Sequence, residues 1–333
     1  MKQKILVIGG AGYLGVVLVK KLLENNYSVR ILDSFIYGKR SVDQFKKDNS
    51  VEIIGGDIRN ISTVNSSMNG VDGVILLAAV VGDPASASRP EQTIETNYLA
   101  SQMTASACKL KNIRRFIYAS TCSVYGIGNR ILDENAPLSP ISLYARTKIS
   151  SEKSILQLAN DSFSPAIMRM STLYGYSPRM RFDLVVNTMT MTAFLEKKIK
   201  VYGGTQWRPL LHVEDAAASY IKVLESDNGH RVYNVGSEEQ NYRIKEVAQI
   251  ISTSIGQHTG ENVTITTESG NTDNRDYRVS FKKIRDELGF CTKHTVSDAV
   301  KEIYDRLESG VIKNPKQKVY YNHYFDSSEE LIG

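Results

Sequence analysis

A run of closely spaced glycines near the N-terminus constrains the fold of this chain more than any other feature of its sequence. Gly9, Gly12 and Gly15 directly follow a short apolar segment, and an amphipathic stretch begins at Tyr13. Residues without a Cβ let a backbone turn sharply, approach a bound group closely and pack a helix against a strand. The pattern therefore predicts a strand, a tight loop and a helix whose N-terminus faces an anion.

Short β-branched segments alternate with amphipathic stretches over the first half of the chain. The expected strands are Lys4–Ile8, Ser28–Asp33, Val51–Ile54, Gly73–Leu77, Arg115–Ala119 and Ser164–Met170, and the expected helices between them include Tyr13–Asn25, Pro90–Leu110 and Leu143–Asn160. Buried strands separated by helices are typical of parallel strands joined by crossovers. We therefore expect an α/β fold, with a Rossmann-type doubly wound parallel sheet.

The alternation loosens beyond Tyr174, where short segments at Lys200–Tyr202, Arg231–Val235 and Val263–Thr266 lie among helices. This change predicts a smaller α/β lobe instead of a second independent sheet. We expect a first domain of residues 1–175, a second lobe of residues 176–312 from which some segments return to the first domain, and a loosely packed C-terminal tail of residues 313–333.

Composition excludes several classes of protein. The formal net charge is +5, but Lys and Arg are interleaved with Asp and Glu, so nothing indicates nucleic-acid binding, whereas an anionic small molecule suits the surplus. Cys108, Cys122 and Cys291 are too few and too widely spaced for a disulfide framework or a zinc site. No segment approaches the roughly 18 apolar residues that a membrane span requires. We expect a cytoplasmic protein with no metal and no membrane partner.

An acidic residue at the end of the second expected strand extends the glycine pattern. Asp33 follows the glycines by roughly 20 residues, which is the arrangement of a dinucleotide-binding site. A carboxylate at this point accepts hydrogen bonds from ribose hydroxyls and repels a 2′-phosphate, which favours NAD over NADP. Lys39 and Arg40 either counter that repulsion or are ordinary solvated charges, and Asp57 either abuts the adenine or is a plain turn residue.

Tyr144 and Lys148 lie four residues apart, and hence on one helix face. A nearby ammonium lowers the pKa of a tyrosine from its usual value of about 10, so the pair can take a proton from an alcohol while a hydride leaves the same carbon. A surface helix pair is the alternative. The hydroxyl-rich segment Ala119–Gly126 favours the catalytic interpretation, because it ends a strand at the edge where ligands of such sheets bind.

Taken together, these motifs resemble the extended short-chain dehydrogenase/reductase superfamily, and more narrowly its nucleotide-sugar epimerase/dehydratase branch. The motifs are the glycine loop, Asp33, Ser120–Gly126, Tyr144 with Lys148, and Arg208–Asp215. The resemblance runs from Lys4 to about Leu307. It implies an NAD-dependent enzyme that acts on a nucleotide-diphosphate sugar, similar to UDP-glucose 4-epimerases and nucleotide-heptose 4-dehydrogenases. It also implies a homodimer formed through the helices Pro90–Leu110 and Leu143–Asn160.

The resemblance implies a role for each matching residue. Tyr144 would be the catalytic acid/base, Lys148 would hold the nicotinamide ribose and lower the tyrosine pKa, and Thr121 would bond the reacting sugar hydroxyl. The other cofactor-binding residues implied are Gly9, Gly12, Tyr13, Leu14, Gly15, Asp33, Asp57, Ile58, Ala78, Ala79 and Asn97, and the substrate-binding residues are Thr121, Arg181, Asn187, Arg208 and Arg275. Arginine forks fit the oxygens of a diphosphate.

Some of these roles have structural alternatives. Asn97 either lies near the active site or serves ordinary helix packing, and Arg179 and Arg181 either approach the substrate or are solvated loop residues. His212 and Asp215 are expected to hold the local fold and are left out of the site.

The chain departs from the family pattern directly after Thr121. Sugar 4,6-dehydratases of the branch place Asp and Glu there, whereas this chain has Cys122 and Ser123. Elimination of water is therefore disfavoured, and Cys122 is expected to be a packed thiol. The leading hypothesis is a nucleotide-sugar 4-epimerase that passes through a 4-keto intermediate. The alternatives are a 4-dehydrogenase or 4-ketoreductase of surface polysaccharide biosynthesis, and a non-catalytic NAD(P)-binding regulator on the same fold.

Overall fold

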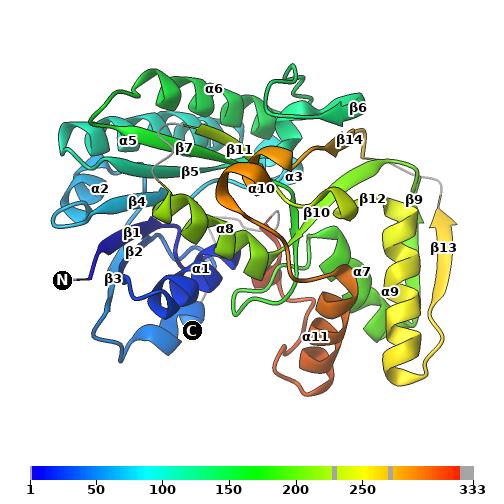
Figure 1. The fold of residues 1–333 in the computed structure, drawn as a ribbon. Coiled ribbons are helices and arrows are strands. Elements are labelled where there is room, and N and C mark those ends of the chain that lie inside the picture. Colours follow the sequence, from blue (N-terminus) through cyan, green and yellow to red (C-terminus); the bar gives the residue numbers. More distant parts are fainter. Residues whose placement is uncertain (1, 227–230, 269–272, 323–333) are drawn as a thin grey trace.

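A seven-stranded sheet forms the centre of the larger domain, and each pair of neighbouring strands in it is parallel (Figure 1). The computed structural model describes residues 2–226, 231–268 and 273–322. In spatial order the strands are β11 (Arg231–Val235), β7 (Ser164–Met170), β5 (Arg115–Thr121), β4 (Gly73–Leu76), β1 (Lys4–Ile8), β2 (Ser28–Asp33) and β3 (Val51–Gly55). The order reverses direction between β1 and β4, as in a Rossmann fold, which confirms the predicted fold class.

Helices cover both faces of this sheet, and the alternation of side chains along β1 shows how. Ile5 and Val7 belong to the hydrophobic cluster on one face, whereas Leu6 and Ile8 belong to the cluster on the other face. The first face carries α1 (Tyr13–Glu24) and α8 (Val213–Glu225), and the second carries α2 (Ile61–Ser67), α5 (Ala100–Leu110) and α6 (Leu143–Gln157). Burial on both faces explains the continuous apolar runs of these strands.

The expected strands agree closely with the observed ones, but one expected helix is interrupted. The segment Pro90–Leu110 consists of α4 (Pro90–Ile94), a π-helical turn at Glu95–Leu99 and α5. Within that turn the carbonyl of Asn97 accepts a hydrogen bond from Ser151 Oγ at 2.6 Å. A single π-helical turn inside a helix is typical of functional sites, and here a contact with α6 accompanies it.

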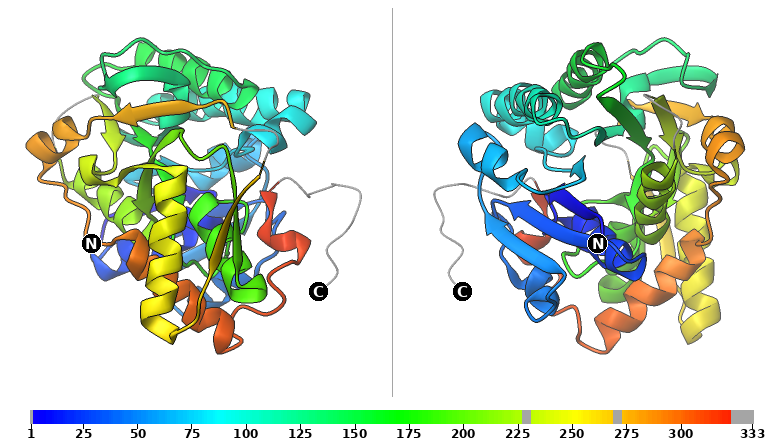
Figure 2. Two further views of the ribbon diagram at one scale, coloured as in Figure 1. Left: turned by 90° about the vertical axis from the view of Figure 1, so that its right-hand side faces the viewer. Right: turned by 60° about the vertical axis from the view of Figure 1, so that its left-hand side comes forward.

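The smaller lobe packs three helices around a third hydrophobic cluster (Figure 2). These helices are α7 (Val185–Glu196), α9 (Ile244–Thr259) and α11 (Val296–Glu308). A three-stranded sheet there consists of β12 (Asn241–Arg243), β10 (Trp207–His212) and β8 (Thr172–Tyr174). Two further sheets have two strands each: β13 (Thr264–Glu268) pairs with β9 (Lys198–Tyr202), and β14 (Asp276–Val279) pairs with β6 (Ile127–Leu132). Two short helices, α3 (Asp83–Ser88) and α10 (Lys282–Leu288), complete the α-helices of the described residues.

The chain crosses between the two parts several times. The segment 231–235 leaves the smaller lobe to form the edge strand β11 of the large sheet. Over the residues described, the structure contains no helix with the length and apolar character of a membrane span.

The C-terminal segment is more ordered than the sequence suggests. Tyr320 accepts a hydrogen bond at its carbonyl from the N–H of Phe182 at 2.9 Å, and its ring packs edge-on against the Phe182 ring. Asn322 is buried and joins Arg89 to Arg179. Residues 320 and 322 are therefore packed against other segments, in contrast to the loose packing expected there, whereas residues 323–333 lie outside the described residues.

Candidate active site

The glycine loop lies between β1 and α1, at the point where the strand order reverses. Gly9 has a φ of +90°, and a Cβ at this position would lie 2.7 Å from the backbone nitrogen of Ala78. A Cβ on Gly15 would overlap the carbonyl oxygen of Gly9. Gly12 is the N-cap of α1, and no side chain of the described residues caps this helix, so its N-terminal N–H groups suit an anion.

Asp33 is fixed against this loop by two backbone groups. Its Oδ2 accepts a hydrogen bond from the N–H of Ala11 at 2.9 Å, and its Oδ1 accepts one from the N–H of Phe35 at 2.8 Å. Burial raises the pKa of Asp33, while these two bonds and the charge of Arg179 oppose that rise. A carboxylate has about four acceptor positions, so Asp33 keeps acceptors for two ribose hydroxyls.

The other residues predicted around the glycine loop serve it in different ways. Tyr13 donates from its hydroxyl to the carbonyl of Gly175 at 2.6 Å, which ties the loop to the smaller lobe. Leu14 is half-buried at the start of α1, and Ala78 and Ala79 are half-buried just after β4, with Ala78 beside Gly9. These positions line the strand ends where the cofactor was expected.

Asp57 and Asn97 have partners that favour their structural alternatives. The carboxylate of Asp57 accepts hydrogen bonds from the backbone and the side chain of Arg59, as a turn aspartate does, and Ile58 is buried in the core. Asn97 has no exposed surface, and its amide holds Val80 by two hydrogen bonds of 2.8 and 3.0 Å. Asn97 thus fixes the loop that follows β4, and a contact with the cofactor remains a prediction for both residues.

The helix α6 carries the expected catalytic pair. Ser142 caps it, because its Oγ accepts a hydrogen bond from the N–H of Ala145. Tyr144 and Lys148 follow on one face, and the Nζ of Lys148 donates to the carbonyl of Ala119 at 2.8 Å. Lys148 is only 2% exposed, and burial lowers its pKa to about 7 against the opposing charge of Glu152. A lysine in this state gains or loses its proton near neutral pH.

The hydroxyls of Tyr144 and Thr121 lie together at the carboxyl end of β5. Burial raises the pKa of Tyr144, and the main influences that lower it are the charges of Arg181 and Arg275 and a hydrogen bond with Thr121. The sequence assigned this effect to Lys148, whose Nζ instead lies 5.9 Å from the Tyr144 ring centre and bonds to Ala119. The cations with the largest effect on Tyr144 thus come from the smaller lobe, and an effect of Lys148 stays a prediction.

A buried ion pair that the sequence reading missed lies beneath the catalytic pair. Glu152 sits on the same face of α6 as Tyr144 and Lys148, and its Oε2 lies 2.7 Å from Nη2 of Arg169 on β7. The two side chains are 3% and 6% exposed. Ser120 donates its hydroxyl to Glu152, so the carboxylate links β5, β7 and α6. The helical spacing from Lys148 was a usable signal for Glu152, whereas nothing in the sequence pointed to Arg169.

The two arginines expected to bind the diphosphate converge on one carboxylate. Nη2 of Arg208 lies 2.7 Å from Oδ2 of Asp273, and Nε of Arg275 lies 2.9 Å from its Oδ1. These partners hold the pKa of Asp273 well below its usual range, against the effect of burial. Arg275 also donates to Ser123 Oγ at 3.3 Å, two residues beyond Thr121. The structure therefore brings both predicted arginines to one anion-binding place beside the end of β5.

The remaining two predicted substrate residues differ in outcome. Arg181 is buried and forms a bidentate ion pair with Asp183, with distances of 3.0 and 2.8 Å. Its charge lowers the pKa of Tyr144, so it lies near the reactive hydroxyl. Asn187 has no exposed surface, accepts from the N–H of Gly175 and donates to the carbonyl of Arg181 and the hydroxyl of Tyr13. The structure gives Asn187 a structural role and does not support the prediction that it binds substrate.

Arg179 proved to be a packing residue between distant segments and not a solvated loop arginine. Its guanidinium lies 3.8 Å from the ring centre of Tyr37 and donates to Asn322 Oδ1 at 2.7 Å. Burial lowers its pKa to about 10. These contacts join the loop after β2 to the smaller lobe and to the C-terminal segment.

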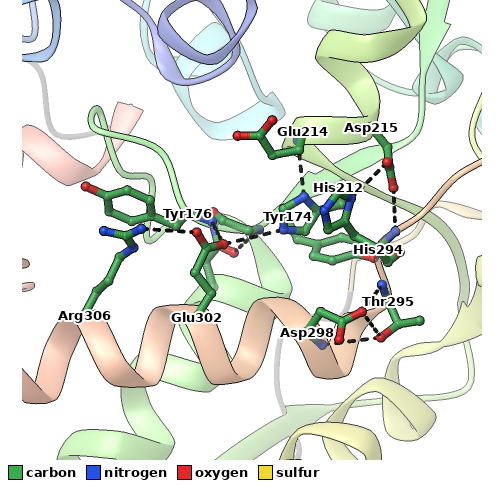
Figure 3. A network of polar contacts seen from close by, with 12 residues as sticks. Tyr174, Tyr176, His212, Glu214, Asp215, His294, Thr295, Asp298, Glu302 and Arg306 are labelled. Carbon is green, nitrogen blue, oxygen red and sulfur yellow. Dashed lines mark hydrogen bonds and ion pairs between the residues drawn. The ribbon is translucent and has the colours of Figure 1, made fainter. Parts of the chain in front are cut away.

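His212 and Asp215 hold the local fold, as the sequence suggested (Figure 3). Nδ1 of His212 accepts from the N–H of Glu214 at 3.2 Å and so caps α8. Asp215 accepts from the backbone N–H groups of Lys293 and His294, which fixes the segment that leads into α11. The His212 ring also packs against Gly175, whose carbonyl receives the Tyr13 hydroxyl. This network therefore connects the smaller lobe to the glycine loop.

Cys122 is a packed thiol, as expected. Its Sγ donates to the carbonyl of Arg169 at 3.2 Å, and burial raises its pKa far above that of a reactive cysteine. The position that follows Thr121 thus supplies no acid or base.

The site geometry agrees with what comparison with known proteins finds. Over residues 5–236 the sequence matches the NAD dependent epimerase/dehydratase family. The chain belongs to this family. The predictions of an enzyme of the extended short-chain dehydrogenase/reductase superfamily and of NAD as its cofactor are confirmed.

Relatives within the family have different reactions. The chain is 26% identical to a UDP-glucose 4-epimerase of Corynebacterium glutamicum, over 88% of this chain and 92% of that protein. It is 30% identical to a UDP-N-acetyl-alpha-D-glucosaminuronate decarboxylase of Bacillus cytotoxicus, over 75% and 80%. The crystal structure of the UDP-glucuronic acid 4-epimerase from Bacillus cereus with UDP-glucuronic acid and NAD matches with a TM-score of 0.80 at 25% identity, covering 92% of this chain and 99% of that one.

Proposed function

We propose that this protein is a nucleotide-sugar 4-epimerase that oxidises and re-reduces C4 of its sugar with one NAD. The observation that carries the proposal is that the Tyr144 and Thr121 hydroxyls lie together beside Lys148, at the carboxyl end of β5. In a doubly wound sheet this edge, next to the strand-order reversal, is where cofactor and substrate bind. A sugar hydroxyl placed there meets a base and a hydrogen-bond donor at once.

The residues around the reversal fit NAD. The glycine loop leaves room for a pyrophosphate at the N-terminus of α1, and Asp33 keeps acceptors for the ribose. Lys148 would hold the nicotinamide ribose from the other side. Bound NAD would supply the hydride acceptor and donor for the sugar carbon.

The chain's own residues move the proton. Tyr144, as the phenolate, accepts the proton of the C4 hydroxyl, and the positive charges of Arg181 and Arg275 make that form more accessible. Thr121 donates a hydrogen bond to the same sugar oxygen. Tyr144 returns the proton to the oxygen as the 4-keto sugar is reduced on its opposite face. Because the sugar regains both the hydride and the proton, there is no net redox change.

One feature supports this reaction over dehydration, and a second supports a diphosphate substrate. Dehydration needs a carboxylate acid/base pair, and the positions after Thr121 hold a buried thiol and a serine that accepts from Arg275. The arginines near the site are suited to a substrate diphosphate, because Arg208 and Arg275 already converge on one carboxylate, Asp273. A diphosphate would take the place of that carboxylate.

An apolar stripe on the π-helical turn and α5 supports the expected homodimer. Leu99, Met103 and Leu110 are 45%, 44% and 84% exposed and recur at helical spacing on the outside of the domain. A second copy would cover this stripe, and light scattering of the purified protein tests it. If the wild-type protein is a monomer and Met103→Lys leaves its oligomeric state unchanged, the dimer is contradicted.

The test of the proposed function starts with the purified protein. Mass spectrometry should find NAD, and incubation with UDP, dTDP, GDP and CDP sugars should give a C4-inverted product by NMR without continuing NADH formation. Continuing formation or consumption of NADH supports the dehydrogenase or ketoreductase instead. A Tyr144→Phe variant with full turnover would refute every form of the mechanism, and inertness with all substrates supports the regulator.

A further inference from the structure

Asp83 is the first residue of the short helix α3, which lies in the connection between β4 and α4. The preceding Gly82 has a φ of +96°, a backbone conformation that favours glycine. Two residues earlier, Val80 is held in both directions by the amide of Asn97. The buried amide therefore fixes the start of this loop and limits where the Asp83 side chain can lie.

The carboxylate of Asp83 is close to the reactive groups and incompletely paired. Its Oδ2 lies 3.5 Å from Nε of Arg275, and its negative charge raises the pKa of Tyr144. Its Oδ1 is buried and, within the residues described, has no hydrogen-bond partner. Because a buried oxygen without a donor costs free energy, a donor supplied by a ligand would bind there favourably.

The cations around Asp83 already have carboxylate partners. Arg181 is held at two points by Asp183, and Arg275 is shared between Asp273 and Asp83. Arg208 also pairs with Asp273. A sugar carboxylate entering this region would meet Asp83 without an uncommitted cation among these three arginines.

We propose that Asp83 determines substrate specificity: it accepts a hydrogen bond from a hydroxyl or amino group of the sugar and excludes sugars that carry a carboxylate. This inference rests on the proposed function, since it names the class of sugar that the same site takes. Neutral or amino sugars are accepted, and uronic acids are rejected by repulsion between two carboxylates.

The test compares two sugars that differ in one group. Binding of UDP, dTDP, GDP and CDP to the NAD-loaded protein first identifies the base by calorimetry. The glucose and glucuronic acid esters of that base are then compared on the wild-type protein and on Asp83→Asn, which keeps the shape and removes the charge. Asp286→Asn on the exposed helix α10 is the matched control.

The wild-type protein should bind the glucose ester at least about tenfold more tightly, which corresponds to ~1.4 kcal/mol of repulsion. Asp83→Asn should reduce this ratio to about threefold or less by strengthening the binding of the glucuronic acid ester, whereas Asp286→Asn should leave the ratio unchanged. Equal binding of both esters by the wild-type protein overturns the inference, even if the variant fails to fold. An unchanged ratio in Asp83→Asn also overturns it, while the proposed function stands. If no nucleotide sugar binds, the proposed function fails, and the inference falls with it.

Discussion

Replacing Glu152 by Gln tests the buried ion pair beneath the catalytic residues. The change keeps the shape of the side chain and its acceptor for Ser120, but it removes the charge that faces Arg169. Among the described residues, Arg169 then remains buried with a positive charge and keeps only uncharged acceptors: the new amide oxygen, the Tyr125 hydroxyl at 3.0 Å and the carbonyl of Glu134 at 3.3 Å.

The expected loss is large because both side chains are almost fully buried. Removing one partner of a buried pair costs about 3–5 kcal/mol of unfolding free energy, out of the roughly 5–15 kcal/mol that a domain has. In contrast, Asp43 and Lys46 form an exposed pair, and Asp43→Asn should cost no more than about 1 kcal/mol. The comparison separates burial of the charge from the mere loss of an ion pair.

Urea unfolding followed by circular dichroism measures these differences. The double variant Glu152→Gln with Arg169→Met removes both charges, so it should recover at least about half of the stability lost in the single variant. Two results would refute the reasoning: a Glu152→Gln protein within about 1 kcal/mol of the wild type, or a double variant no more stable than the single one.

Three further perturbations have defined outcomes. The folded pKa of Lys148 is about 7 and its unfolded value is about 10.4, so the unfolded state binds more protons between these values, and stability should rise with pH in that window. Lys148→Met should remove up to ~1.4 kcal/mol per pH unit of this slope in urea titrations of the NAD-free protein. An identical slope in the variant contradicts the burial argument. Gly15→Ala would push a Cβ into the carbonyl of Gly9, so it should abolish retention of NAD through purification, and normal NAD content would count against the loop geometry. Asn322→Ala removes the hydrogen-bond acceptor that the described residues give the buried Arg179 and should cost about 1–3 kcal/mol, whereas a thermally unchanged protein would show that the C-terminal contact is dispensable.

The sequence predicted the parts of this protein that depend on local chemistry. Strands such as Lys4–Ile8 were readable because residues buried on both faces of a sheet must be apolar throughout. Asp33 was readable because its spacing from the glycines follows from the length of one helix and one strand. Thr121 and Tyr144 were predicted as a pair because each lies in a compact motif; the structure places their hydroxyls together, and their catalytic role stays a prediction.

The parts that were missed depend on contacts between distant segments. The π-helical turn at Asn97 lies where α6 and the loop after β4 meet it, and the sequence of that helix alone contains no sign of them. The hydrogen bonds of the Asn187 amide with Gly175 and Tyr13 were not predictable either, because they join segments far apart in the sequence. The same reason explains why Asn322 was expected in a loose tail.

The electrostatics of the site change the simple picture of a lysine that activates a tyrosine. Burial lowers the pKa of Lys148 and raises the pKa of Tyr144, so it disfavours the charged form of both residues. Glu152 supports the ammonium from beneath, while Arg181 and Arg275 support the phenolate from the smaller lobe. The charges of the pair thus depend on groups from α6 and from the smaller lobe. Because Arg275 also meets Asp273, a diphosphate that displaces this carboxylate would change the field at Tyr144, and substrate binding would be coupled directly to the reactivity of the base.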